Sequence, residues 1–314
     1  MPKPDDRPPL RRALVACRTA IASVMAELIA RIPALEPAFL RTCRGAARRR
    51  GFVFGLCWAI NVRLNDVLRR RSSEFREMTI AGTPMWLDVT DQSGFGLYFY
   101  GDPYEPRLTT TLLERLRDGD VFVDVGANTG FFTLLAATRV GERGRVVAFE
   151  PHPGARARLV RLLARNDVAA RVTVVASAVS DSLGSQPLHL TGQSALSTLD
   201  PSVAPGREHF AYTQTVTVDL TTLDDWMRQH EDLPSRITLI KVDVEGLEDK
   251  VIAGARQTLA QAPRAHVVCE TNAGSAADRQ LLAAGFDAVT LEPPEGSYPG
   301  NRFYSPPRTS YHTA

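Results

Sequence analysis

The sequence predicts an α/β fold in which a mostly parallel sheet carries helices on both faces. The first observation is a run of four apolar residues and one acid, Val121–Val125, that breaks into a glycine-bounded turn and continues into an apolar helix. The second is that strand-like and helix-like patterns alternate from residue 145 to residue 291, as in a parallel sheet with crossover helices. The third is a basic segment of helical pattern before this region, which predicts an N-terminal helical extension.

Charge is distributed unevenly along the 314 residues, whose net charge is +2. Residues 1–76 hold 16 Lys and Arg against 6 Asp and Glu, whereas the remainder holds 21 against 29. The apolar content of 44% and the charged content of 23% are ordinary for a globular protein. We therefore expect a basic helical extension over residues 1–76 and an α/β domain over residues 77–314, with its core at about 96–305.

Apolar residues recur every three or four positions through the start of the extension and form one stripe along a predicted helix. Three interpretations of the extension remain open. The stripe packs on the α/β domain or on a second copy in a homo-oligomer, the basic and aromatic stretch 48–71 makes peripheral contact with an anionic membrane, or the segment binds nucleic acid. Nucleic-acid binding is the weakest of these, because the chain shows no recognised nucleic-acid module. The stripe comprises Leu14, Cys17, Ile21, Val24, Leu28 and Ile32.

Targeting and metal-binding signals are weak in this chain. Its longest apolar run in the extension, residues 52–60, is far shorter than the roughly 20 residues that a membrane-spanning helix needs. The charged, Pro-rich opening does not resemble a secretory signal. The four cysteines, at positions 17, 43, 57 and 269, show no CxxC spacing, and the six histidines are scattered. We therefore expect a cytoplasmic protein without a disulfide framework and without a metal site built from Cys or His.

The elements of the α/β domain follow from local patterns in chain order. Residues 78–89 and 96–100 are predicted to form a lead-in pair of strands, with turn signals at Gly94 and Gly96. Short extended pieces at 186–190 and 214–218 are predicted to form an insertion between core elements. We expect core strands at 121–125, 145–150, 172–176, 237–242, 266–270 and 287–291, helices at 108–117, 131–137, 153–165, 223–229, 247–259 and 276–284, and a short last strand around 302–304.

The turn between Gly126 and Gly130 predicts a ligand site. A strand, a glycine turn and a helix in succession place unpaired backbone N–H groups and a helix N-terminus against a ligand, and the glycines allow close approach. The fingerprint of pyrophosphate-binding turns requires a glycine where Asn128 stands. This difference favours S-adenosylmethionine over a dinucleotide as the ligand.

Acids occur at the ends of the first two predicted core strands. Asp124 lies near the end of the first, and Glu150 follows the second, 26 residues later. A carboxylate at the carboxyl edge of the second strand can accept hydrogen bonds from both hydroxyls of a ribose. The alternatives are that Asp124 is a buried acid bonded to loop N–H groups and that Glu150 is a solvated strand end.

A second cluster of chemical groups follows the strand predicted at 237–242. With a period of two, Lys241, Asp243 and Glu245 share one face of this segment. A lysine in a buried strand is costly unless it is paired, so one or more of these acids is expected to neutralise it. The cluster is then either a structural ion pair or the place where an acceptor is held and gives up its proton. In a variant of the second interpretation, Asp243, Glu270 and Asn272 bind Mg²⁺.

The chain resembles the FkbM-type S-adenosylmethionine-dependent methyltransferases from about residue 96 to residue 305. The segment that follows the Leu-Asp-Asp stretch and runs from Ile240 to Gly246 is the most specific motif, whereas the first glycine motif alone would indicate only the wider superfamily. The matching motifs are Gly119-Asp-Val-Phe-Val-Asp-Val-Gly-Ala-Asn-Thr-Gly130, Ala148-Phe-Glu-Pro151, Asn166, Ala178-Val-Ser-Asp181, Ser197-Thr-Leu199, Thr222-Leu-Asp-Asp-Trp226, Ile240-Lys-Val-Asp-Val-Glu-Gly246 and Val268-Cys-Glu270.

The resemblance implies a Rossmann-like class I methyltransferase fold and, usually, O-methylation of a hydroxyl on a sugar or secondary metabolite. It places Glu150 at the cofactor's ribose, and Ser180 and Asp181 near its adenine. It places Lys241, Asp243 and Glu245 on the acceptor side, where one of the two acids takes the acceptor's proton. The methionine end of the cofactor is implied to lie among Asp124, Gly126, Ala127, Asn128 and Gly130.

Other functions fit the sequence less well. A nucleic-acid base methyltransferase would show an Asn/Asp-Pro-Pro-aromatic loop where this chain has Asp243-Val-Glu-Gly246, so a nucleic-acid acceptor is not expected. Asn128 disfavours a dehydrogenase. Two alternatives stay open: metal-assisted O-methylation of a catechol-like small molecule, and a non-catalytic protein that binds S-adenosylmethionine.

Overall fold

The computed structural model describes residues 9–47, 52–68, 70–71, 74–100, 105–191, 197–202, 212–294 and 299–307. The chain divides into two compact units, Met1–Tyr104 and Glu105–Ala314. The expected domain boundary after residue 76 stays a prediction. In the described part of the chain, each helix is too short or too polar to cross a membrane.

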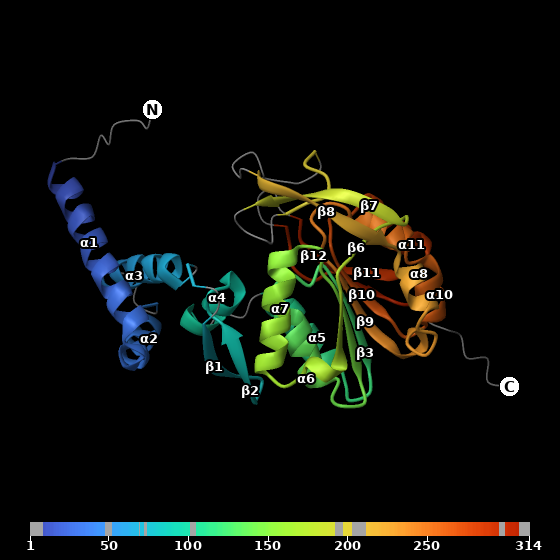
Figure 1. The fold of residues 1–314 in the computed structure, drawn as a ribbon, viewed down its shortest axis with the longest axis horizontal. Coiled ribbons are helices and arrows are strands. Elements are labelled where there is room, and N and C mark those ends of the chain that lie inside the picture. The colour runs from blue at the N-terminus through green and yellow to red at the C-terminus, as the bar shows by residue number, and fades with distance from the viewer. Residues whose placement is uncertain are drawn as a thin grey trace. The chain divides into compact units, whose positions relative to one another are not determined.

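The N-terminal unit is built on helices with one small hairpin (Figure 1). Helix α1 (Pro9–Arg31) packs on α3 (Phe52–Leu68), and α2 (Glu36–Ala47) also packs on α3. The antiparallel strands β1 (Phe75–Ile80) and β2 (Thr83–Asp88) and the helix α4 (Gln92–Tyr100) complete the unit. Its apolar core includes Ala22, Ala26, Ile29, Cys57, Ile60, Leu64, Phe95 and Phe99.

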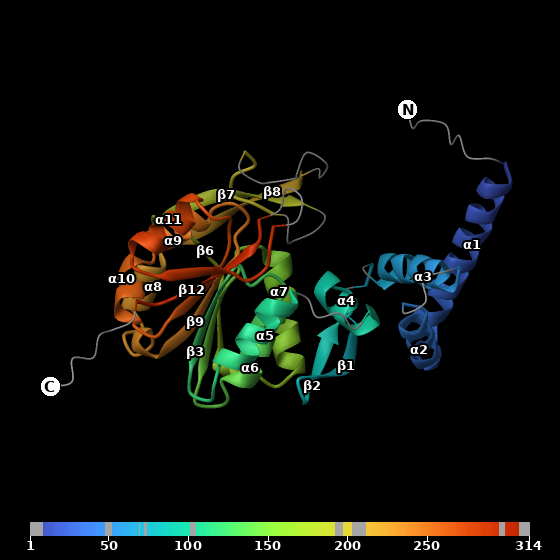
Figure 2. The same ribbon diagram turned by 180° about the vertical axis from the view of Figure 1, so that it is seen from behind.

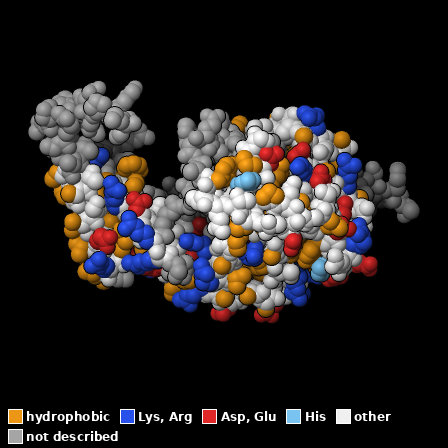
Figure 3. Space-filling view, turned by 45° about the horizontal axis from the view of Figure 1, so that its top comes forward, with side chains coloured by type: hydrophobic (Ala, Val, Ile, Leu, Met, Phe, Trp, Pro, Cys, Tyr) orange, Lys and Arg blue, Asp and Glu red, His pale blue; other side chains and the backbone are white. Residues whose placement is uncertain are grey.

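The predicted apolar stripe of α1 is not the face that builds this core. Helix α1 is buried instead through Ala22, Ala26, Ile29 and Ala30, which lie nearly opposite to the stripe around the helix. Hydrophobic side chains are visible on the surface of the N-terminal unit in Figure 3. The exposed fractions of the stripe residues are 44% at Ile21, 60% at Val24, 39% at Leu28 and 45% at Ile32.

The prediction of a strand at residues 96–100 is wrong, because these residues lie in α4. Phe95 and Phe99 lie one helical turn apart, their ring centroids are 4.5 Å apart, and both side chains are buried in the core of the N-terminal unit. A helix brings both rings to the same side, and this tertiary packing outweighs the β propensity of the aromatic run. The partner of β1 is therefore β2, within the segment that was predicted as one strand.

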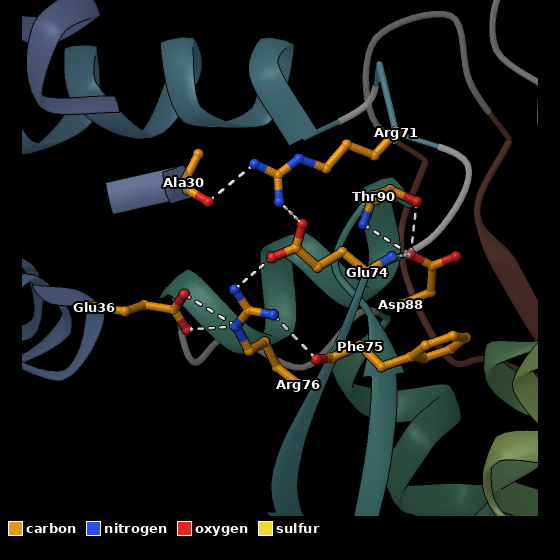
Figure 4. Close-up of polar contacts among 8 residues, drawn as sticks. All are labelled: Ala30, Glu36, Arg71, Glu74, Phe75, Arg76, Asp88 and Thr90. Atoms are coloured by element: carbon orange, nitrogen blue, oxygen red, sulfur yellow. Dashed lines mark hydrogen bonds and ion pairs between the residues drawn. The ribbon is translucent and has the colours of Figure 1, made fainter. Parts of the chain in front are cut away.

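A network of partly buried charges holds the hairpin to the helices of the same unit (Figure 4). Arg76 donates to both carboxylate oxygens of Glu36 at 3.0 Å and to Glu74 at 2.6 Å. Arg71 pairs with Glu74 and donates to the carbonyl oxygen of Ala30 at 2.9 Å. These contacts tie the ends of α1 and α2 to the start of β1.

The C-terminal unit contains a seven-stranded sheet in the order β11-β12-β10-β9-β3-β4-β5. All neighbouring pairs from β10 to β5 are parallel, whereas β12 runs antiparallel to both β10 and β11. The fold class predicted from the sequence is therefore confirmed. The strands are β3 (Val121–Val125), β4 (Arg145–Phe149), β5 (Val172–Val175), β9 (Ile237–Val242), β10 (His266–Glu270), β11 (Asp287–Thr290) and β12 (Asn301–Ser305).

Helices cover both faces of this sheet (Figures 1 and 2). Helices α5 (Pro106–Arg115), α6 (Phe131–Arg139) and α7 (Pro153–Arg165) lie on one face, and α8 (Leu223–Arg228) and α11 (Ala276–Ala283) on the other. The helix predicted at 247–259 is broken into α9 (Glu248–Ala253) and α10 (Arg256–Gln261). The break falls at Gly254, where a Cβ atom would lie 2.1 Å from the carbonyl oxygen of Ser180.

The predicted insertion forms a separate sheet in the order β6-β8-β7. Strand β7 (Gly184–Thr191) pairs antiparallel with β8 (Tyr212–Thr221), and the short β6 (Ala178–Val179) runs parallel to β8. The connection predicted at 194–199 lies partly outside the described residues.

The strand order reverses at β3, which has β4 on one side and β9 on the other. In open α/β sheets, ligands bind outside the carboxyl ends of the strands at such a switch point. Asp124, Glu150, Asp243 and Glu270 all lie at the carboxyl ends of β3, β4, β9 and β10.

Candidate active site

The turn after β3 is closed by its own backbone. The N–H groups of Gly126 and Ala127 donate to the carbonyl oxygen of Phe149, that of Asn128 donates to Glu150, and that of Gly130 donates to Ala127. The expectation that this turn offers unpaired N–H groups to a ligand is therefore wrong at these four positions. A pyrophosphate would require such donors, so the finding agrees with the preference for a cofactor without phosphate.

Gly126 is required by a close contact between two parts of the protein backbone. Its φ is +82°, and a Cβ atom there would lie 1.9 Å from the carbonyl oxygen of Asp243. The turn after β3 thus packs directly against the turn after β9. At Gly130, whose φ is +96°, a Cβ atom would lie 2.3 Å from the Leu159 side chain on α7. Gly126 and Gly130 thus allow the turn after β3 to lie in close contact with the turn after β9 and with helix α7.

Asp124 lies inside the sheet and is almost fully buried, with 1% of its surface exposed. Its Oδ2 accepts a hydrogen bond from the hydroxyl of Thr133 at 2.6 Å, and its Oδ1 lies 3.7 Å from Nζ of Lys241. Burial raises the pKa of Asp124. Its partners are thus a side-chain hydroxyl and an ammonium group, and not the loop N–H groups of the alternative interpretation.

Glu150 is buried at the end of β4, so the alternative of a solvated strand end is wrong. Its Oε2 accepts from the N–H of Asn128 at 2.6 Å and its Oε1 from the N–H of His152 at 2.7 Å. Burial raises the pKa of Glu150 to about 7. Each oxygen has a second lone pair beyond the N–H that holds it, so the carboxylate can still accept two hydroxyls.

Lys241 is buried in β9 and is neutralised as expected. Its Nζ lies 3.0 Å from Oδ2 of Asp243 and 3.4 Å from the carbonyl oxygen of Gly126, and it sits 5.6 Å from the ring centroid of Phe132. Burial opposes the charge on Lys241, but Asp243, Asp124 and Glu105 outweigh it and raise its pKa. Sequence reasoning missed Asp124 and Glu105 as partners of this lysine.

Asp243 and Glu245 do not share a strand face with Lys241, as the alternation of side chains along a strand predicted, because β9 ends at Val242. Asp243 and Glu245 lie in the turn that follows, where Glu245 has a φ of +66° and Gly246 a φ of +102°. This turn is held by Glu248, whose carboxylate accepts from the N–H groups of Val244 at 3.1 Å and Gly246 at 3.0 Å.

Ser180 and Asp181 follow β6, away from the first glycine turn in sequence. Ser180 is buried, its N–H donates to the carbonyl oxygen of Thr221, and its hydroxyl lies 3.3 Å from Asp181. The Asp181 side chain is exposed. Their predicted position beside an adenine stays a prediction.

A hollow of about 580 Å³ opens among the start of α5, the end of β10 and the segment before β12. It is walled by prolines and by three acids, Glu105, Glu270 and Glu292, and Arg107 also lines it. Burial and the charge of Asp243 raise the pKa of Glu270 to about 11, so this carboxyl is neutral at pH 7. A larger hollow of about 740 Å³ beside α10 and α11 is mostly apolar and contains none of the predicted site residues.

The Mg²⁺ variant gains no support from the described residues. Among them, no group of three or more His, Cys, Asp and Glu side chains is arranged to hold a metal ion. Asp243 is instead committed to Lys241, and the Glu270 carboxyl lies beside it as a neutral group.

The mostly parallel seven-stranded sheet with helices on both faces has the fold of the class I methyltransferases. Comparison with known proteins agrees: the FkbM methyltransferase domain matches residues 124–287. This chain belongs to the FkbM methyltransferase family, and its cofactor is S-adenosylmethionine.

One curated relative supports this membership. Methyltransferase sdnD of Sordaria araneosa is 32% identical over 200 residues, which are 56% of this chain and 76% of that protein. Among solved structures, fibrillarin of Aeropyrum pernix with bound S-adenosyl-L-methionine matches 75% of this chain and 84% of its own, with 12% identity and a TM-score of 0.39. The precorrin-6y C5,15-methyltransferase of Geobacter metallireducens matches 64% and 86%, with 16% identity and a TM-score of 0.36. These low scores carry no argument about function.

Proposed function

We propose that this methyltransferase is an O-methyltransferase that acts on a hydroxyl of a small molecule or glycan. The observation that carries the proposal is the Lys241–Asp243 ion pair after β9. It contacts the glycine turn at Gly126, and its charges act on Glu105, which lines the acid-lined hollow. A charged pair and further carboxyls suit a polar acceptor that must lose a proton. Methyl transfer to a thiolate would need no such base.

On the cofactor side, Glu150 is the residue that best fits the ribose. Its carboxylate is fixed by two N–H groups and still has lone pairs for two hydroxyls. The turn from Gly126 to Gly130, with Asp124 beneath it, would face the methionine end, and Ser180 with Asp181 would face the adenine. The bound cofactor supplies a methyl group on a sulfonium that is already an excellent leaving group.

On the acceptor side, the protein's main task is alignment. Lys241 holds Asp243 by an ion pair of 3.0 Å. Asp243 and Glu245 would orient the acceptor hydroxyl toward the methyl group, and Lys241 would stabilise the negative charge that forms on the oxygen. Positioning of this kind accounts for a large share of the barrier reduction in bimolecular transfers.

The proposal is tested by transfer of a tritiated methyl group from S-adenosylmethionine to a set of hydroxylated acceptors. The set comprises methyl α-D-mannopyranoside, L-rhamnose, D-glucuronate and 3,4-dihydroxybenzoate, each assayed with and without a chelator. We expect transfer to at least one acceptor, a loss of about 100-fold or more in Asp243→Asn, and unchanged binding of S-adenosylhomocysteine. Glu114→Gln, on the exposed side of α5, makes the same kind of change away from the hollow and serves as control.

Three other results would favour a different function or contradict the assigned site. Transfer that a chelator abolishes would favour metal-assisted methylation of a catechol. Cofactor binding without transfer to any acceptor would favour a non-catalytic binding protein. Full activity in Asp243→Asn would contradict the assignment of the acceptor side.

The expectations about location and partners stay proposals as well. Membrane contact through residues 48–71 is tested by co-sedimentation with vesicles that contain phosphatidylserine, and a homo-oligomer by light scattering. The cytoplasmic location is tested by fractionating cells that express the chain.

A further inference from the structure

Glu105, the first residue of the C-terminal unit, adopts a conformation that its sequence position does not explain. It occupies the N-cap position of α5, where a short polar side chain normally accepts from the first N–H groups of the helix. Its carboxylate makes no such capping bond. Its φ of +44° lies in the left-handed region, which is uncommon for a residue with a side chain, and such outliers cluster at functional sites.

The side chain is directed into the hollow by an amide on β12. Nδ2 of the buried Asn301 donates to Oε2 of Glu105 at 2.8 Å and to Oε2 of Glu292 at 2.9 Å. The other oxygen of Glu292 accepts from the backbone N–H of Arg107 at 3.0 Å. Residues far apart in the sequence thus hold the Glu105 carboxyl in one position.

In this position, the charges of the Lys241–Asp243 pair act on Glu105. Burial and the charges of Asp243 and Glu292 together raise the pKa of Glu105 to about 7, against the opposing charge of Lys241 and the hydrogen bond from Asn301. The charges that act on Glu105 therefore come from β9, from the turn after it and from the segment before β12. The charge of Glu105 in turn helps to raise the pKa of Lys241.

Glu292, Asp243 and Glu270 are less suited than Glu105 to take a proton. Glu292 accepts hydrogen bonds at both of its oxygens, from Asn301 at 2.9 Å and from the N–H of Arg107 at 3.0 Å. Asp243 is engaged by Lys241 at 3.0 Å, and Glu270, with its pKa raised to about 11, already carries its proton at pH 7. A general base works best when its pKa lies near the working pH, because it is then available and still basic.

We propose that Glu105 is a further catalytic residue of this enzyme, the general base that takes the proton of the acceptor hydroxyl. The proposal rests on the O-methyltransferase function proposed above. The acceptor oxygen forms a bond to the methyl carbon, and the bond between that carbon and sulfur breaks with its electron pair remaining on sulfur. The hydroxyl proton passes to the Glu105 carboxylate, which later releases it to water.

The first test is the pH dependence of tritiated methyl transfer to the best acceptor of the set named above. With S-adenosylmethionine kept saturating, so that the titration of Glu150 does not contribute, we expect kcat/KM of the wild type for the acceptor to rise about tenfold per pH unit below 7 and to level off above it. Glu105→Gln should lower kcat by about 100-fold or more and remove this acid limb, and it should bind S-adenosylhomocysteine within about twofold of the wild type. Glu105→Asp should recover part of the activity, and Glu114→Gln should keep both the rate and the limb.

The second test needs no acceptor. Carbon-13 NMR of glutamate carboxyls should show two groups that titrate near pH 7, one absent from Glu105→Gln and the other from Glu150→Gln. A Glu105→Gln enzyme with the rate and acid limb of the wild type would overturn the proposal, and so would a spectrum without a titrating carboxyl assigned to Glu105. Failure of the folded wild type to bind S-adenosylhomocysteine would instead overturn the proposed function itself.

Discussion

At the scale of single residues, acids in similar sequence settings have different roles because their neighbours differ. Glu150 could be predicted, since it stands at the end of a core strand at the expected spacing. The position of Glu105 at the hollow could not, because it depends on Asn301, a residue 196 positions later, and on a backbone conformation that no local pattern signals. Lys241 was expected to pair with the acids in its own segment, yet Asp124, 117 positions earlier, also faces it.

The pKa of Glu150 gives a prediction about pH. Hydroxyl donors of a ribose bind the ionised carboxylate better than the protonated one, and burial raises this pKa to about 7. The ionised fraction grows as the pH rises, so we expect the affinity for S-adenosylhomocysteine to increase about tenfold from pH 6 to pH 8. Calorimetric titration checks this, and Glu150→Gln should bind weakly with no such increase. An affinity that is equal at both pH values would contradict the ribose assignment.

Among the elements, sequence patterns predicted the strands and helices whose bounds are set by local residue order. The predictions failed where tertiary packing determines the structure. Strands β3, β9 and β10 and helix α7 were predicted with the bounds they have, because their apolar runs are strong and well delimited. Residues 96–100 were misread because two aromatic rings pack one helical turn apart. The break between α9 and α10 was missed because Gly254 is required there by the backbone of Ser180, which is distant in sequence.

The contact between the turn after β3 and the turn after β9 predicts the effect of adding a methyl group at Gly126. Gly126→Ala would place a Cβ atom 1.9 Å from the carbonyl oxygen of Asp243, so the turn after β9 must move. We expect weaker binding of S-adenosylhomocysteine, methyl transfer reduced about 100-fold or more by misalignment, and a lower melting temperature. Gly119→Ala is the matched control, because Gly119 also has a positive φ, of +91°, but nothing lies within 4 Å of the added Cβ. Equal losses in the two variants would show that backbone strain, and not the contact, is responsible.

At the scale of the whole molecule, the chain joins a methyltransferase unit to a smaller unit with its own core. The uneven charge and the helical extension could be read from the sequence, but the choice of the buried face of α1 could not. Small residues such as Ala22 and Ala26 allow close packing against α3, and they leave the larger Val24 and Leu28 exposed. Hydrophobic periodicity alone does not distinguish a stripe of large residues from a stripe of small ones that packs more closely.

We predict that the edge of the sheet formed by β3 and β4 binds S-adenosylmethionine. Calorimetric titration of the wild-type 314-residue chain with S-adenosylhomocysteine at pH 8 tests this prediction. We predict saturable binding of one molecule per chain. A folded protein that shows no heat of binding, and whose melting temperature S-adenosylhomocysteine does not raise, would contradict the account.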